Sequence, residues 1–318
     1  MNSRNNKYKI SIIIPVYNGA NTIEKLVDEL ISNIRPLFPL EIVLINDDSP
    51  DNSETVCISL VEKYPQTVCF YSLSINVGEH NAVMAGLNEM TGDFAVIMDD
   101  DFQNPVSEVL KLIDYTVTND YDVVYTYYAK KKHSFFRNIG SLFNDKVANL
   151  MLKKPRNLYL SSFKALNRFL VDEVIKYKLP FPYLDGLILR TTSNIGKILV
   201  EHNERKHGRS NYTLRKLFSL WMNMFTNFSI LPLRMSVIIG FIFSVIGFIL
   251  GIYVVFEKIV NPDMPLGYSS LFFVVSIYSG IQLIAIGMVG EYLGRVFLSQ
   301  NKKPQYSIRK SFNKMNNE

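Results

Sequence analysis

The chain has 318 residues, of which 48% are hydrophobic, and a formal net charge of +5. Its two cysteines are too few for a disulfide framework and belong to no CxxC pair, which argues against a disulfide-rich fold and against structural zinc. The basic residues cluster near apolar segments, so the modest positive charge does not indicate nucleic-acid binding. The apolar excess is concentrated after residue 230. We therefore expect one large domain followed by a membrane part.

Apolar strands alternate with helices through the first hundred residues. Strands are predicted over 10–16, 41–45, 68–73 and 94–98, and helices follow the first three strands, from about residues 22, 53 and 80. This alternation predicts an α/β fold with a doubly wound, mostly parallel sheet. Ligands bind such sheets beyond the carboxyl ends of the strands, and a polar cluster follows each strand here. Neither G-x-G-x-x-G nor a P-loop follows the first strand, which disfavours the dinucleotide-binding and P-loop classes.

An acidic run, Asp99-Asp100-Asp101-Phe102-Gln103, directly follows the fourth predicted strand. Three carboxylates at the end of a buried strand repel one another and lose hydration, so they favour a divalent cation as counter-charge. In an extended segment alternate residues point the same way, so Asp99, Asp101 and Gln103 should converge while Asp100 points elsewhere. Their oxygen atoms suit Mg²⁺ or Mn²⁺, metals that usually hold a substrate diphosphate. The alternative is an acidic turn that caps the next helix at Asn104-Pro105.

Two long uncharged segments, 235–256 and 268–290, predict a hairpin of two transmembrane helices. A buried pair of helices in a soluble protein is the alternative. The outer flanks of the hairpin are basic. In its connection the single basic residue Lys258 is outnumbered by two acidic ones, Glu257 and Asp263. The positive-inside rule therefore predicts that both termini are cytoplasmic.

The segment before the hairpin carries an apolar stripe beside basic residues, which predicts amphipathic helices at the membrane interface. Packing of this stripe on a neighbouring subunit is the alternative. The expected organisation has four parts. They are a cytosolic catalytic domain over 1–212, juxtamembrane helices over 213–232, the two transmembrane helices within 233–292, and a basic cytosolic tail over 293–318.

Several motifs resemble glycosyltransferase family 2, whose fold is called GT-A. They are Ile14-Pro15-Val16-Tyr17-Asn18, Asp47-Asp48-Ser49-Pro50-Asp51, Asn76-Val77-Gly78 and the stretch from Gly92 to Pro105. The D-x-D-x-Q-x-P form of the last stretch resembles the polyprenyl-phosphate glycosyltransferases, the group that contains dolichol-phosphate mannose synthase. Segments 232–234, 290–295 and 303–306 resemble its bacterial branch, which loads undecaprenyl phosphate.

This resemblance implies an inverting enzyme that moves a sugar from a nucleotide diphosphate donor, most often a UDP-sugar, to undecaprenyl phosphate. The implied setting is the bacterial inner (cytoplasmic) membrane, the use is lipopolysaccharide or O-antigen modification, and the implied assembly is a homo-oligomer, a tetramer in relatives. The implied metal ligands are Asp99, Asp101 and Gln103. The implied nucleotide contacts are Pro15, Tyr17, Asp47, Asp99, Asp100, Lys164, Arg205 and Ser210. The residues expected to act in catalysis are Asp101, Lys164 and Arg205.

The chain departs from the family pattern at two points. Gly19-Ala20 stands where many relatives carry an acidic residue after the asparagine of the first loop, and no catalytic base can be assigned before Lys164. A lipid phosphate monoester is largely ionised at about pH 7 and can attack without a strong base. Asp185 either faces the acceptor or sugar, or is a carboxylate at a helix start.

Two other functions stay open from the sequence. One is a processive polysaccharide synthase of the same family, although the Q-x-x-R-W segment of those enzymes is absent around Trp221, the chain's single tryptophan. The other is a non-catalytic membrane scaffold that keeps the fold.

Overall fold

The computed structural model describes residues 7–128, 158–201, 231–261, 267–301 and 304–313. The chain divides into two compact units. The first comprises Met1–Tyr212 together with Lys303–Glu318, and the second comprises Thr213–Lys302.

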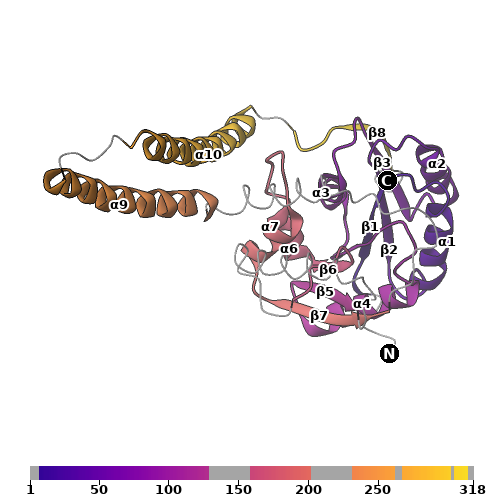
Figure 1. The fold of residues 1–318 in the computed structure, drawn as a ribbon. Coiled ribbons are helices and arrows are strands. Elements are labelled where there is room, and N and C mark those ends of the chain that lie inside the picture. The colour runs from indigo at the N-terminus through magenta and orange to yellow at the C-terminus, as the bar shows by residue number, and fades with distance from the viewer. Residues whose placement is uncertain (1–6, 129–157, 202–230, 262–266, 302–303, 314–318) are drawn as a thin grey trace. The chain divides into compact units, whose positions relative to one another are not determined.

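The first unit is built on an eight-stranded sheet with the order β7-β5-β6-β4-β1-β2-β3-β8 (Figure 1). The strands are β1 Ile10–Val16, β2 Leu40–Asn46, β3 Val68–Leu73, β4 Phe94–Ile97, β5 Val123–Tyr128, β6 Lys164–Asn167, β7 Ile195–Val200 and β8 Ile308–Phe312. Within this sheet β6 and β8 pair antiparallel with their neighbours, and the remaining pairs are parallel. The expectation of a mostly parallel α/β sheet is therefore confirmed.

Helices cover both faces of the sheet (Figure 1). They are α1 Ile23–Ile34, α2 Ser53–Lys63, α3 Glu79–Glu89, α4 Val106–Asn119, α6 Arg168–Val174 and α7 Leu184–Thr191. The apolar sides of α1, α2 and α4 share one core with alternate residues of β1, such as Ile12 and Ile14. On the opposite face α3 packs closely against β1. Only a glycine fits at position 86, because a Cβ there would lie 2.4 Å from Cγ2 of Ile13. The central strands are thus buried on both faces, which explains their continuous β-branched runs.

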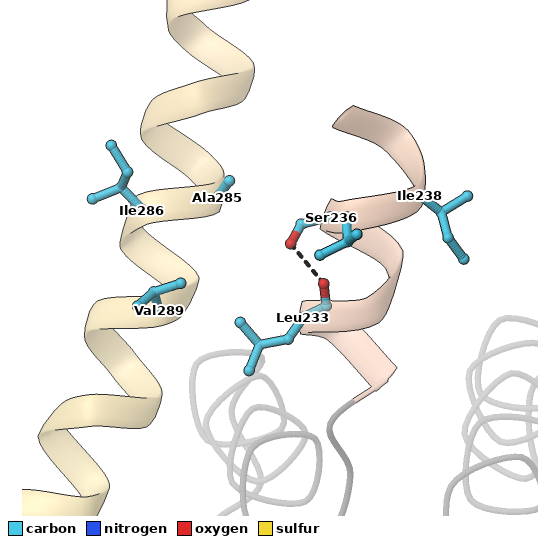
Figure 2. A pocket seen from close by; sticks show the side chains of 7 residues that line it. Leu233, Ser236, Ile238, Ala285, Ile286 and Val289 are labelled. Atoms are coloured by element: carbon cyan, nitrogen blue, oxygen red, sulfur yellow. Dashed lines mark hydrogen bonds between the residues drawn. The ribbon is translucent and has the colours of Figure 1, made fainter. Parts of the chain in front are cut away.

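The second unit contains two long helices, α9 Leu231–Val260 and α10 Tyr268–Gln300. Their most apolar windows, Ser236–Tyr253 and Ile277–Leu298, have mean hydropathies of 2.4 and 1.4. Both helices are long and apolar enough to cross a membrane. Figure 2 shows the groove between them, where the Ser236 hydroxyl donates to the Leu233 carbonyl at 2.9 Å. This bond satisfies the hydroxyl within its own helix.

The structure differs from the expected tail over 293–318. Helix α10 continues to Gln300, and the chain then returns to the first unit as β8, antiparallel to β3. The Gln305 side-chain amide donates to the carbonyls of Tyr177 and Leu179, both at 2.8 Å. The Phe312 ring stacks on Phe70 with centroids 6.1 Å apart. Residues 308–312 are therefore part of the sheet, and Arg309 and Lys310 lie on its edge strand.

Candidate functional site

Two hydrogen bonds join the loop after β1 to the segment after β2 at the carboxyl edge of the sheet. The backbone N–H of Gly19 donates to Oγ of Ser53 at 3.0 Å, and that of Ala20 donates to Oδ2 of Asp51 at 3.2 Å. Asn18 and Asp48 adopt positive φ angles of 58° and 51°, which these residue types tolerate. The cross-loop bonds fix the first loop at the edge where ligands enter such sheets.

The expected nucleotide contacts Pro15, Tyr17 and Asp47 lie at this same edge. The Tyr17 side chain is 46% exposed, which leaves its ring available to a planar ligand. Asp47 is buried, and its two carboxylate oxygens accept the backbone N–H groups of Val77 (2.8 Å) and Gly78 (2.9 Å). Burial raises the pKa of Asp47 in spite of these bonds. Asp47 thus holds the turn after β3 against the end of β2.

The acidic loop after β4 is bent and not extended as expected. Strand β4 ends at Ile97, and Phe102 turns the chain with a φ of 59°, an uncommon value for a bulky residue. After this turn the backbone N–H of Gln103 donates to Oδ1 of Asp101 at 3.1 Å. Oδ2 of Asp99 accepts the hydroxyl of Ser162 at 2.8 Å. The carboxylates of Asp99 and Asp101 are therefore oriented by different partners.

Asp100 points away from this loop and lies beneath the first loop. Its Oδ2 is buried and has no hydrogen-bond partner among the described residues. Burial raises the pKa of Asp100 to about 7, and the neighbouring charges of Asp99 and Asp101 add to the shift. Asp100 was expected as a nucleotide contact, and the structure places its carboxyl group against Gly19.

Gly19 leaves room for that carboxyl group. A Cβ at Gly19 would lie 2.2 Å from Oδ2 of Asp100 and 3.0 Å from Cγ1 of Val16. The space is therefore taken by Asp100, which explains why a larger residue does not follow Asn18 here.

We expect the Gly19→Ala substitution to displace Asp100 and the first loop, and to lower the free energy of unfolding by about 1–3 kcal/mol. Urea denaturation of the detergent-solubilised protein measures this change. Gly19→Ala/Asp100→Ala should recover stability because the second change removes the clash. Gly240→Ala, where a Cβ meets nothing within 4 Å, is the matched control. An unchanged Gly19→Ala protein would contradict the packing described here.

Lys164 is buried, so the alternative that its residue type suggests, an ordinary surface lysine, is wrong. It is 3% exposed, and its ammonium group forms an ion pair with the Asp185 carboxylate in the first turn of α7. Asp185 is therefore a carboxylate at a helix start that also faces a cation. His80, at the start of α3, packs edge-on against Tyr183 with ring centroids 5.3 Å apart. Burial lowers the pKa of His80, the Asp185 charge opposes this shift and the Lys164 charge adds to it.

Sequence reasoning missed two residues of this site, Tyr125 and Ser162. The Tyr125 hydroxyl donates to Oδ1 of Asp185 at 2.8 Å, and Ser162 bonds Asp99. Ser162 stands two residues before Lys164, so its proximity in the chain was a usable signal. No local signal marks Tyr125, because its partner lies 60 residues away in the chain. Arg205 and Ser210 lie outside the described residues.

No group of three or more His, Cys, Asp or Glu side chains in the described part of the chain is placed to hold a metal ion. The expected set differs from such a group because it combines two carboxylates with the amide of Gln103. Oxygen donors from one loop at the carboxyl edge of the sheet match the preference of Mg²⁺ and Mn²⁺.

The order of the sheet and the position of the acidic loop at its carboxyl edge match the GT-A fold. A solved structure of glucosyl-3-phosphoglycerate synthase from Mycobacterium tuberculosis with phosphoglyceric acid matches with a TM-score of 0.51 at 17% identity, over 69% of this chain and 79% of that one. The same enzyme with Mn²⁺, UDP and phosphoglyceric acid also matches with a TM-score of 0.51, at 18% identity and the same coverage. At these identities the likeness concerns the fold alone.

The model for "Glycosyl transferase family 2" matches residues 11–175. The undecaprenyl-phosphate 4-deoxy-4-formamido-L-arabinose transferase of Serratia proteamaculans is 30% identical over 95% of this chain and 93% of its own. The transferase of the same name from Photorhabdus laumondii is also 30% identical, over 95% of this chain and 94% of its own. The chain belongs to glycosyltransferase family 2 and is a glycosyltransferase.

Proposed function

We propose that this enzyme transfers a sugar from a UDP-sugar to undecaprenyl phosphate with inversion at the anomeric carbon. The observation that carries this proposal is the oriented acidic loop after β4, next to buried Lys164, in a family 2 chain. The names of its relatives, which cite undecaprenyl phosphate, support the acceptor. The solved neighbour with UDP and Mn²⁺ supports the donor class.

The nucleotide would lie at the edge formed by the first three strand ends. The exposed Tyr17 ring offers a face for the base, and Pro15 and Asp47 would lie beside the base and ribose. The diphosphate would face the acidic loop, where Lys164 supplies positive charge. Arg205 and Ser210 belong to an R-x-x-G-x-S segment of the sequence, and we assign them to the same diphosphate.

Asp99, Asp101 and Gln103 would hold Mg²⁺ or Mn²⁺. A bound cation of this kind supplies positive charge that compensates the diphosphate. The Ser162 hydroxyl orients the Asp99 carboxylate, and the backbone N–H of Gln103 orients the Asp101 carboxylate. These contacts keep two mutually repelling carboxylates in place.

In the reaction an oxygen of the lipid phosphate forms a bond to the anomeric carbon while the bond from that carbon to the UDP oxygen breaks. The electron pair of the broken bond stays with UDP. The lipid phosphate is mostly ionised at about pH 7, so the attack needs no strong base. The product is a β-linked lipid-phosphate sugar when the donor is α.

The proposed setting follows from the two apolar helices and the flanking charges. Helices α9 and α10 would form the transmembrane hairpin, with the catalytic domain and both termini on the cytoplasmic side of the bacterial inner membrane. Residues 213–232 would lie at the interface, and the enzyme would work as a homo-oligomer. The product would serve lipopolysaccharide, O-antigen or related glycan modification.

Membranes that contain the enzyme should label undecaprenyl phosphate from one donor in a panel of radiolabelled UDP-sugars. Organic extraction separates the lipid product from the unused donor. Membranes without the enzyme are the control, and omission of divalent cation tests the metal. The proposal would be refuted if purified enzyme with metal, acceptor and the full panel left the organic phase unlabelled.

A further inference from the structure

A buried ionic network lies where β5, β6 and α7 meet. The Lys164 ammonium and the Tyr125 hydroxyl both contact Oδ1 of Asp185. All three side chains are buried, with exposed fractions of 3%, 0% and 7% for Lys164, Tyr125 and Asp185. One carboxylate oxygen therefore accepts two donors away from bulk water.

The sheet fixes the lysine of this network from a second side. Lys164 pairs with Tyr125 across β5 and β6 and with Ile97 at the end of β4. Its Nζ lies 5.0 Å from the centroid of the Tyr125 ring, within the range of a cation–π contact. Burial raises the pKa of Tyr125, and the charge of Asp185 adds to this shift, so the hydroxyl stays protonated and donates a hydrogen bond to the carboxylate.

The network adjoins the acidic loop. Ser162 bonds Asp99 from the segment that leads into β6, and Ile97, the partner of Lys164, stands two residues before Asp99. The end of β4 therefore brings the network next to the place assigned to the diphosphate.

The stability of the fold does not account for this arrangement. Burying two charges costs desolvation free energy that their attraction barely recovers, and an apolar group of the same volume is often as stable. Lys164 and Tyr125 both donate to one oxygen of Asp185, so the effect of the network on the site is to restrict the position of one cation.

We propose that Asp185 and Tyr125 are positioning residues that hold the Lys164 ammonium against the sugar diphosphate. This inference rests on the proposed function, because it needs a diphosphate at the acidic loop. Asp185 then acts through Lys164, because its Oδ1 accepts the ammonium of that lysine. The lysine meets charge that grows on the leaving diphosphate, so loose positioning reduces kcat more than it raises the KM for the donor.

Tyr125→Phe tests this first, because it keeps the ring and the ion pair and removes one hydroxyl. With the full-length enzyme, its labelled UDP-sugar and undecaprenyl phosphate, we expect kcat to fall about tenfold while the donor KM changes less than about twofold. Tyr127→Phe, on the same strand and 37% exposed, is the matched control and should keep wild-type kcat.

A double-mutant cycle with Lys164→Met decides between a positioning role and an independent one. In that background Tyr125→Phe and Asp185→Asn should cause no further loss, because the cation that they hold is gone. Asp185→Glu, which restores a carboxylate, should recover part of the kcat lost in Asp185→Asn. If Asp185→Asn fails to fold, the Tyr125→Phe cycle decides alone.

Equal losses with and without Lys164 would overturn the inference and leave the proposed function standing. Wild-type kcat in Tyr125→Phe would overturn it too. A wild-type enzyme that labels no lipid from any donor would refute the proposed function, and this inference with it.

Discussion

Asp101→Ala is expected to abolish lipid labelling, with a loss of about 10³-fold in kcat/KM. Asp101 is proposed as a metal ligand, and its Oδ1 also accepts the backbone N–H of Gln103. The substitution therefore removes a negative ligand and frees the residue that carries the third proposed ligand. Titration with Mn²⁺ should show that the UDP affinity of the variant no longer depends on the metal.

Asp114→Ala is the matched control for this experiment, because Asp114 lies exposed on α4 and belongs to the same residue type. It should keep wild-type turnover. Both variants should insert into membranes equally, since neither change touches α9 or α10. Metal-dependent turnover in Asp101→Ala at the wild-type level would refute the assignment of this residue.

Lys164→Met is expected to lower both the free energy of unfolding and kcat. Removing the lysine leaves Asp185 buried without its cation, which costs about 3–5 kcal/mol of unfolding free energy. Loss of the positive charge should lower kcat about 100-fold. Urea denaturation in detergent measures the first effect, and lipid labelling measures the second.

The two effects of Lys164→Met can be separated. A triple variant, Tyr125→Phe/Lys164→Met/Asp185→Leu, replaces the whole network by apolar groups of similar volume. Stability should return toward the wild-type value, because no charge is left unpaired. Turnover should stay low, because the cation is still missing. If turnover returned together with stability, Lys164 would be a structural residue only.

The core of the sheet could be predicted from the sequence because parallel strands buried on both faces leave continuous apolar runs. Strands β1 and β3 begin and end where the sequence predicts them, and β2 and β4 differ by a residue at their ends. No strand was predicted after residue 98. Strand β6 has only four residues and begins with Lys164, and β8 carries Arg309 and Lys310, so neither has the continuous apolar sequence that predicts a strand.

The position of the acidic loop after β4 could be predicted from the sequence, and its conformation could not. The acidic loop follows the end of β4 directly, and in sheets of this class the loops after the strands lie at the carboxyl edge where ligands bind. The turn at Phe102 and the burial of Lys164 depend on contacts with distant parts of the chain. Periodicity cannot reveal such contacts, because Asp185, Tyr125 and Ser162 come from three separate segments.

Strand β8 bears on how the catalytic domain could be studied without its membrane helices. A fragment that stops at residue 212 would lack β8 and expose the edge of β3 as an unpaired row of N–H and C=O groups. Such an edge invites pairing between chains and aggregation. A soluble version of the enzyme should therefore keep residues 304–313, joined by a flexible linker that replaces the hydrophobic hairpin.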